Sequence, residues 1–300
     1  RGAVSLVMKE KAEEPFAHVL ERGSYASKSE KVGVGVPAVL PPMAADLPKN
    51  RLGLAKWLMD PKNPLPARVT VNRLWGYIFG TGIVETVEDF GIMGARPSHP
   101  QLLDWLAIEF IESKWNYRHM AKLMVTSATY RQSAHVSPEK LEADPMNRLL
   151  ARAPRYRLEA EPLRDSVLYT SQLLVPQVGG PSVRPYQPQG IWEAVAMDQS
   201  NTRFYKQDSG ESLHRRSMYT IWKRTAPHPA MEILNAPSRE VFCVRRERTN
   251  TPLQAFVTMN DPQFVEGYRQ LAARTMQSAA QPEERLQFLA GLILSRSLSK

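Results

Sequence analysis

The chain has 300 residues, with 39 Lys or Arg against 30 Asp or Glu, so its formal net charge is +9. This length is enough for one large or two small domains with a sizeable core. The single cysteine, Cys243, excludes an internal disulfide, and the sequence contains no Cys-x-x-Cys-His motif for haem attachment and no zinc-type cysteine pair. The longest apolar run, Leu289–Leu294, is far shorter than the roughly 20 residues of a membrane-spanning helix.

The positive charge favours an acidic partner. Candidates are an anionic polysaccharide, an acidic neighbouring domain or a nucleic acid. Nucleic acid is the weakest of these, because the sequence has no helix-turn-helix, RNP or zinc-finger pattern. The histidines are not spaced as a metal-binding pair, so no metal site is expected.

Two regions are expected from the change of pattern along the chain. Residues 1–45 are expected to form an extended N-terminal segment and linker, because short apolar runs such as Val4–Met8 and Ala17–Leu20 precede a stretch rich in glycine and proline. Residues 46–300 are expected to form one mainly helical domain. This domain is expected to be truncated at its C-terminus, as a piece of a longer protein, because the chain ends in an apolar-periodic segment.

The spacing of apolar residues from Asn50 onward predicts a mainly α fold. Asn50 and the capping box Ser98–Gln101 are helix-start signals. Residues 179–237 are rich in Gly, Pro and aromatic side chains, which predicts a long irregular insertion, and Arg216–Lys223 alternates as a strand does. The prediction is therefore an irregular multi-helix domain with a small β element. Helices are expected after Asn50 and near residues 69–79, 99–111, 117–130, 144–152, 159–174, 252–259, 262–277 and 282–295.

The stretch Arg239–Asp261 carries the strongest signal for a binding site. Several of its arginines present guanidinium groups that suit a carboxylate, sulfate or phosphate. Thr251 and Gln254 form a capping box, and a helix start can attract an anion. The alternative is that the arginines pair with Glu240, Glu247 and other carboxylates inside the fold.

The irregular insertion adds aromatic residues beside basic ones, a combination that suits a sugar ring or a stacked base. The alternative is that these aromatic side chains only fill the space between the insertion and the helices. The candidate ligand-binding residues are Arg215, Arg216, Tyr219, Trp222, Arg224, Arg239, Arg245, Arg246 and Asn250.

Three carboxylates near these arginines, Glu161, Asp165 and Glu240, are second-tier candidates for an enzyme site. A general acid needs surroundings that raise its pKa, and the sequence shows none. Ser182 lacks a Gly-x-Ser-x-Gly context, and Cys243 lies between apolar neighbours, as a core residue does. No catalytic residue is therefore assigned.

A series of short motifs runs through the chain: Asn63–Val69, Val71–Trp75, Glu88–Gly91, Pro97–Pro100, Leu103–Ala107, Asp144–Arg152, Arg164-Asp165, Gly179–Val183, Arg215–Ser217 and Arg239–Ala255. In this order they resemble the C-terminal domain of unknown function of planctomycete-type, exported, cytochrome-c-associated multidomain proteins. The resemblance implies a periplasmic or cell-surface location and haem c elsewhere in the parent protein, with no cofactor in this region. Two positions depart from the pattern: Asn235 stands where Asp is usual, and Ser171-Gln172 where Ser-Gly is usual. If that Asp is catalytic in the family, the activity is weakened here.

Three functions follow as hypotheses. The first is a domain that binds an anionic ligand, such as acidic polysaccharide, through an arginine and aromatic face. The second is an enzyme acting on polysaccharide with the carboxylates beside the arginines. The third is a scaffold that docks a haem domain or another domain of the parent chain.

Overall fold

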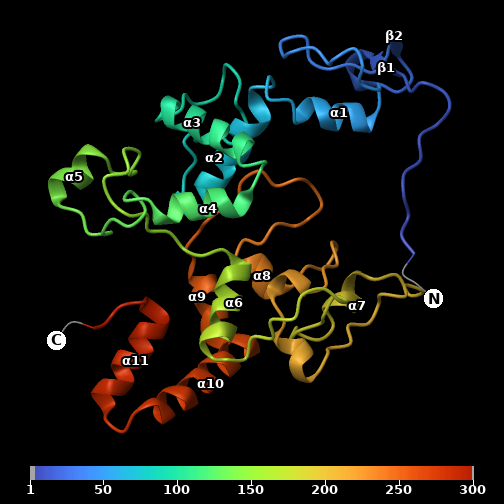
Figure 1. Cartoon of the computed structure of the whole chain (residues 1–300). Coiled ribbons are helices and arrows are strands. Elements are labelled where there is room, and N and C mark those ends of the chain that lie inside the picture. The colour runs from blue at the N-terminus through green and yellow to red at the C-terminus, as the bar shows by residue number, and fades with distance from the viewer. Residues whose placement is uncertain (1–3, 299–300) are drawn as a thin grey trace. The chain divides into compact units, whose positions relative to one another are not determined.

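The computed structural model describes residues 4–298 and divides the chain into two compact units, Arg1–Pro154 and Arg155–Lys300. The described residues form eleven α-helices and one two-stranded antiparallel sheet (Figure 1). The prediction of an irregular, mainly helical fold with a small β element is therefore confirmed. None of these helices is long and apolar enough to cross a membrane.

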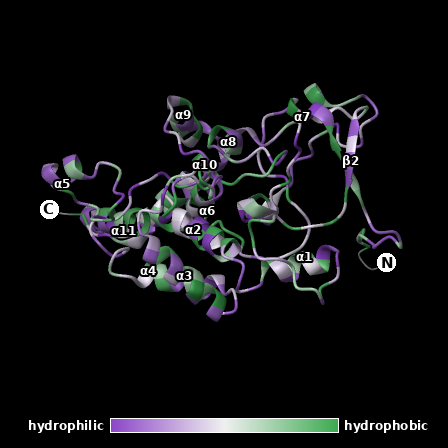
Figure 2. Ribbon diagram, turned by 90° about the horizontal axis from the view of Figure 1, so that it is seen from above, coloured by the Kyte–Doolittle hydropathy of each residue, from purple (hydrophilic) through white to green (hydrophobic). Residues whose placement is uncertain are grey.

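The first unit begins with the sheet, in which β1 (Ala17–Leu20) pairs with β2 (Lys28–Val32). Ala17 lies opposite Val32 and His18 opposite Lys31, and a bulge follows before Leu20 pairs with Lys28. All five residues of β2 are exposed, and Figure 2 shows a mostly hydrophilic strand. The predicted strand at Ala17–Leu20 is confirmed, whereas Val4–Met8 is not a strand and is exposed.

Five helices complete the first unit: α1 (Arg51–Leu58), α2 (Leu65–Phe79), α3 (Pro100–Glu112), α4 (Tyr117–Thr126) and α5 (Pro138–Ala143). As predicted, Asn50 caps α1, and its side-chain oxygen accepts from the amides of Leu52 and Gly53. Helix α2 ends at Gly80, whose φ of 91° favours glycine. Helices α2, α3 and α4 enclose an apolar core that includes Val71, Leu106, Phe110 and Met120.

The second unit contains α6 (Ala160–Thr170), α7 (Ile191–Val195), α8 (Pro229–Ile233), α9 (Pro252–Asn260), α10 (Pro262–Ser278) and α11 (Pro282–Leu294). Two 3-10 turns, Gly210–His214 and Ser217–Tyr219, lie in the irregular insertion. The main apolar cluster here is small, and its fully buried members are Ala160, Met231, Leu234 and Phe264. Prolines at the first positions of α8 to α11 set where these helices start.

The predicted strand at Arg216–Lys223 is wrong. Ser217–Tyr219 is a 3-10 turn, and only single bridges remain, between Val183 and Thr220 and between Lys223 and Ala226. The cause is local, because the Ser217 amide and hydroxyl both donate to Asp165 Oδ1, at 2.8 and 2.6 Å. These bonds hold the backbone in a turn.

Two other local predictions are wrong for similar reasons. Residues 144–152 form turns, because the carboxylate of Asp144 accepts from the amides of Arg148 and Leu149 at 2.8 Å each. The N-cap of α3 lies one residue later than predicted, since Ser98 donates to the Ile83 carbonyl and His99 takes the N-cap position without a side-chain cap.

Candidate functional site

The loop between α8 and α9, residues 238–250, contains the first half of the arginine-rich stretch and has no helix or strand. At its start the guanidinium of Arg239 lies over the ring of Trp222, 4.7 Å from the ring centre. The Trp222 Nε1 donates to the Ser238 carbonyl at 2.9 Å. Since one indole makes both contacts, Trp222 fixes the direction in which the exposed Arg239 leaves the helical body.

Carboxylates from the start of α6 hold the other end of this loop. Arg246 Nη1 lies 2.5 Å from Glu161 and 3.1 Å from Glu159. Arg248 lies 3.8 Å from Glu159 and stacks on Tyr156 at 4.2 Å. The alternative of internal ion pairs therefore applies to Arg246 and Arg248.

The predicted capping box at the start of α9 is confirmed. Thr251 Oγ1 accepts from the Gln254 amide at 3.4 Å, and the Thr251 amide donates to Gln254 Oε1 at 3.1 Å. The buried Gln254 side chain also donates to the Ile233 carbonyl at 2.8 Å. Side chains of the protein itself thus satisfy part of this helix start, which reduces its capacity to bind an external anion.

Asn235, which stands where the resembled pattern has Asp, is an internal hydrogen-bond acceptor. Its Oδ1 accepts from Arg157 Nη2 at 2.8 Å, Thr249 Oγ1 at 2.8 Å and Gln254 Nε2 at 2.7 Å. Its φ of 67° is left-handed, a conformation that Asn tolerates better than most residues. Either an amide or a carboxylate oxygen can accept these three bonds, so the contacts indicate a structural role at this position.

Arg215 is buried, with 4% of its surface exposed, and holds the glycine turn that follows α6. Its guanidinium donates to the carbonyls of Gln177 at 3.1 Å, Gly179 at 2.5 Å and Pro181 at 3.0 Å. It also lies over the ring of Tyr219 at 3.9 Å, and the Tyr219 hydroxyl accepts from the Gly179 amide at 2.8 Å. The structure thus places Arg215 and Tyr219 in an internal arrangement.

Arg164, on α6, is the most buried cation of this unit, with 2% of its surface exposed. It donates to Gln263 Oε1 at 2.5 Å and to the carbonyls of Leu213 at 2.8 Å and Arg215 at 2.9 Å. Burial lowers the pKa of Arg164 to about 10, so the guanidinium stays charged at neutral pH. Asp165, 3.7 Å away, is the counter-charge. The Arg-Asp motif was visible in the sequence, but no local signal revealed its carbonyl partners.

His228 and Asp261 join the insertion to the start of α10. His228 Nε2 lies 2.7 Å from the Tyr186 carbonyl, to which it donates, and burial lowers the pKa of the imidazole. Burial raises the pKa of Asp261, whose Oδ1 accepts from the Gln263 amide at 3.0 Å as the cap of α10. Perturbed groups of this kind occur in functional sites and also in structural networks. Sequence reasoning gave His228 no role, because its partners lie far away along the chain.

The three carboxylate candidates have separate surroundings. Glu161 pairs with Arg246, Asp165 accepts from Ser217, and Glu240 is exposed on the 238–250 loop. The structure thus gives two of them internal partners. Among the described residues, no group of three His, Cys, Asp or Glu could hold a metal ion.

The remaining ligand-binding candidates lie at the surface of the second unit. Arg224 occupies the tip of the short turn between Lys223 and Ala226. Cys243, expected in the core, is exposed, and its thiol donates to the Arg245 carbonyl at 3.2 Å. The exposed candidates are Arg216, Arg224, Arg239, Arg245 and Asn250.

Fold and site together define a mainly helical domain whose second unit has a polar interior and an arginine-bearing loop. The chain belongs to the family PSD1: Protein of unknown function (DUF1553), whose profile matches residues 50–300. The resemblance seen in the sequence is thereby confirmed at the level of a domain of unknown function. No curated protein sequence and no solved structure matches the chain.

Proposed function

We propose that the second unit binds an anionic ligand, with acidic polysaccharide as the favoured class, through exposed arginines beside Trp222. The observation that carries this proposal is the exposed guanidinium of Arg239, which lies 4.7 Å from the centre of the Trp222 ring. A guanidinium stacked on an aromatic ring loses less freedom when it binds, and its planar fork suits carboxylate and sulfate groups.

The proposed face consists of Arg216, Trp222, Arg224, Arg239, Arg245 and Asn250. Three candidates are not included, because they already have partners within the protein. Arg215 donates to backbone carbonyls and lies over the ring of Tyr219, and Arg246 pairs with Glu161. The exposed set still carries four cations against the exposed Glu240 and Glu247 on the same loop, which favours a negatively charged ligand.

The proposal extends to the cellular setting that the resemblance implies. There the domain is part of an exported, cytochrome-c-associated protein at the periplasm or cell surface, where acidic polysaccharides are accessible. Haem c belongs to another part of that protein. Docking of a haem domain is a separate hypothesis, and no contact in the second unit favours it over an anionic glycan.

A titration at several salt concentrations tests the proposal. The protein is titrated with dextran sulfate, alginate and neutral dextran, and binding is followed by calorimetry. Selective binding of one anionic polymer that persists at about 0.15 M salt is the expected result, since diffuse surface attraction is largely screened there. Equal loss of binding to both anionic polymers by that salt concentration would leave only a non-specific charge effect and would refute a dedicated site.

A further inference from the structure

The second unit contains a histidine whose ring is held by a carboxylate. His214 ends the 3-10 turn Gly210–His214, and its Nε2 lies 3.1 Å from Glu266 Oε2 on α10, 52 positions further along the chain. Because the carboxylate accepts from Nε2, the lone pair of the neutral imidazole is on Nδ1. This Nδ1 has no hydrogen-bond partner among residues 4–298 and is not buried. An imidazole oriented by a carboxylate, with its other nitrogen available, is the arrangement of a general base.

A tyrosine contacts the same carboxylate. Burial raises the pKa of the Tyr186 phenol, and the charge of Glu266 and a hydrogen bond to it raise the pKa further. The phenol therefore stays protonated and donates to the carboxylate. Since Glu266 accepts from both a phenol and an imidazole, it has little freedom to turn. It thus holds the ring of His214 in one orientation.

Buried side chains position these three residues. Arg164 donates to the carbonyls of the two chain neighbours of His214, at 2.8 and 2.9 Å. It also donates to Gln263 Oε1 at 2.5 Å, and Gln263 lies one turn before Glu266 on the same side of α10. The Gln263 Nε2 donates to the Tyr186 carbonyl at 3.4 Å. The imidazole, the carboxylate and the tyrosine are therefore supported by one buried network, as a site built for chemistry requires.

An exposed arginine lies beside the histidine. Burial alternates along the segment, with Leu213, Arg215 and Ser217 buried and the two residues between them partly or fully exposed. The backbone is extended at Arg215, with φ of −68° and ψ of 159°, so His214 and Arg216 lie on the same side of the chain. Residues two apart in an extended segment are separated by about 7 Å. A guanidinium at this spacing can hold a carboxylate while the imidazole reaches a neighbouring carbon of the same sugar.

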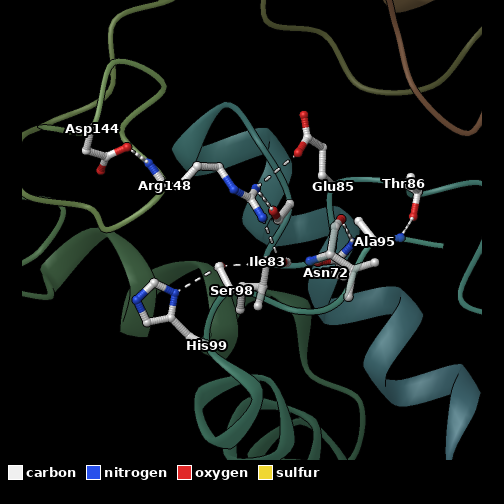
Figure 3. Close-up of polar contacts among 11 residues, drawn as sticks. Asn72, Ile83, Glu85, Thr86, Ala95, Ser98, His99, Asp144 and Arg148 are labelled. Carbon is white, nitrogen blue, oxygen red and sulfur yellow. Dashed lines mark hydrogen bonds and ion pairs between the residues drawn. The ribbon is translucent and has the colours of Figure 1, made fainter. Parts of the chain in front are cut away.

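Two histidines of the first unit provide a contrast. His119 Nε2 lies 2.6 Å from Glu109 Oε1, but this pair is at the surface, with 43% of the His119 side chain exposed. His99 Nδ1 lies 2.9 Å from Ser98 Oγ (Figure 3), and among the described residues no carboxylate bonds to its ring. His214 combines a carboxylate partner, a buried support and a neighbouring exposed arginine, which neither of these histidines does.

We propose that His214, positioned by Glu266 and assisted by Arg216, cleaves uronate-containing polysaccharides by β-elimination. The proposal rests on the proposed function, because it takes the anionic polysaccharide as substrate and uses Arg216 of the ligand face. Hydrolysis of a glycosidic bond ordinarily uses two carboxylates roughly 5–10 Å apart, whereas this cluster has one, which already accepts from two donors. Elimination needs a base and a cation that stabilises the enolate, and the cluster provides both.

The reaction is balanced without a further reactant. Arg216 binds the uronate carboxylate, which makes the hydrogen on the adjacent C5 of the sugar more acidic. His214 Nδ1 takes that proton, and the electron pair of the C5–H bond forms the double bond between C4 and C5. The bond from C4 to the glycosidic oxygen breaks, and its electron pair stays on the oxygen. The imidazolium returns the proton to this oxygen, so the products are a shortened chain and a chain that ends in an unsaturated uronate.

Incubation with polygalacturonate, alginate and hyaluronan tests the proposal, with the ultraviolet absorbance of the unsaturated uronate as the readout. Absorbance should rise with at least one polymer, and His214→Asn should lower kcat by about 10²–10⁴-fold while calorimetry shows unchanged binding. Glu266→Gln keeps the shape but not the charge, and should lower kcat roughly tenfold or more with KM unchanged, which a merely structural role would not do. His119→Asn, which alters the surface pair, is the matched control and should keep full activity.

The possible failures are distinguishable. Binding of a uronate polymer without unsaturated product would overturn the elimination and leave the binding function intact, whereas the absence of both would overturn both. Product formation that is unchanged in His214→Asn would overturn the assignment of the base. Arg216 is exposed, so Arg216→Ala keeps the proposal testable even if the histidine variant does not fold. It should raise KM roughly tenfold, as loss of one charge-assisted contact does, and an unchanged KM would contradict its role.

Discussion

The two units are stabilised in different ways. In the first unit, helices α2 to α4 bury an apolar cluster. Among the described residues of this unit, the buried polar side chains are those of Asn63 and Asn72. In the second unit the apolar cluster is small and the buried polar set is large: Arg164, Ser171, Arg215, Ser217, Thr220, His228, Gln254, Gln263 and Thr275. The difference shows that some arginines of a basic chain, here Arg164 and Arg215, can be buried and can hold an irregular segment in place through hydrogen bonds to its backbone carbonyls.

A buried guanidinium is favourable only when its donors are satisfied. Arg164 meets this requirement with Gln263 and with backbone carbonyls of the insertion, which has few ladder bonds of its own. Arg215 meets it in part, since Nη1 and Nη2 donate to carbonyls and Nε has no partner. Within residues 4–298, the exposed arginines of the proposed face make no comparable set of bonds to carbonyls. Burial and partners therefore separate structural arginines from ligand candidates.

The largest effect is expected for Arg164→Ala. The change leaves the carbonyls of Leu213 and Arg215, and the carboxylate of Asp165, without their cation. Breaking a buried ion pair costs about 3–5 kcal/mol. Hydrogen exchange read by mass spectrometry should show lost protection in residues 175–237, with the first unit unchanged. Unchanged protection of the insertion would mean that Arg164 does not organise it.

An effect of similar size, but confined to one loop, is expected for Asn72→Ala in the first unit. The change leaves the buried amide and carbonyl of Val84 without partners, at roughly 1–3 kcal/mol for each group. The loss of exchange protection should concentrate in residues 80–99. Arg73→Ala, at the exposed neighbouring position, is the control and should change little. Protection lost evenly over the whole first unit would contradict a specific role in holding the loop.

Local signals in the sequence were sufficient to predict helices α1 to α4, α6 and α9 to α11, whereas the short helices α5, α7 and α8 were not predicted. The Asn50 cap, the Thr251 capping box and the helix-initial prolines all act within a few residues. The turn at Ser217 and the role of Arg215 depend on partners distant along the chain. For this reason the alternating pattern of residues 216–223 predicted a strand that is not there, and the charge of Arg215 alone could not separate a ligand-binding role from a structural one. The exposed arginines differ from the buried ones only by tertiary position, which no local pattern encodes.

A pH effect of still smaller size is expected in the second unit. Because burial lowers the pKa of His228, its contribution to stability is fully present above the ordinary histidine pKa of about 6.5 and falls as the pH decreases below it. The raised pKa of Asp261 opposes this loss, since the folded state takes up that proton more readily as the pH falls. Urea unfolding at about pH 7.5 and about pH 5.5 should show lower stability at the acidic value. His228→Gln should reduce the difference, and an equal difference in the variant would assign it to other groups.

The most direct test of the distinction between structural and ligand-binding arginines is dextran sulfate binding by two double variants that remove the same charge. Arg239→Ala/Arg245→Ala alters the proposed face, and Arg118→Ala/Arg131→Ala alters exposed arginines of the first unit. At about 0.15 M salt, binding lost in the first variant and kept in the second, with unchanged thermal unfolding in both, is the predicted result. Equal weakening in both variants would contradict a dedicated face, and loss of folding in the first variant would show that these two arginines are structural as well.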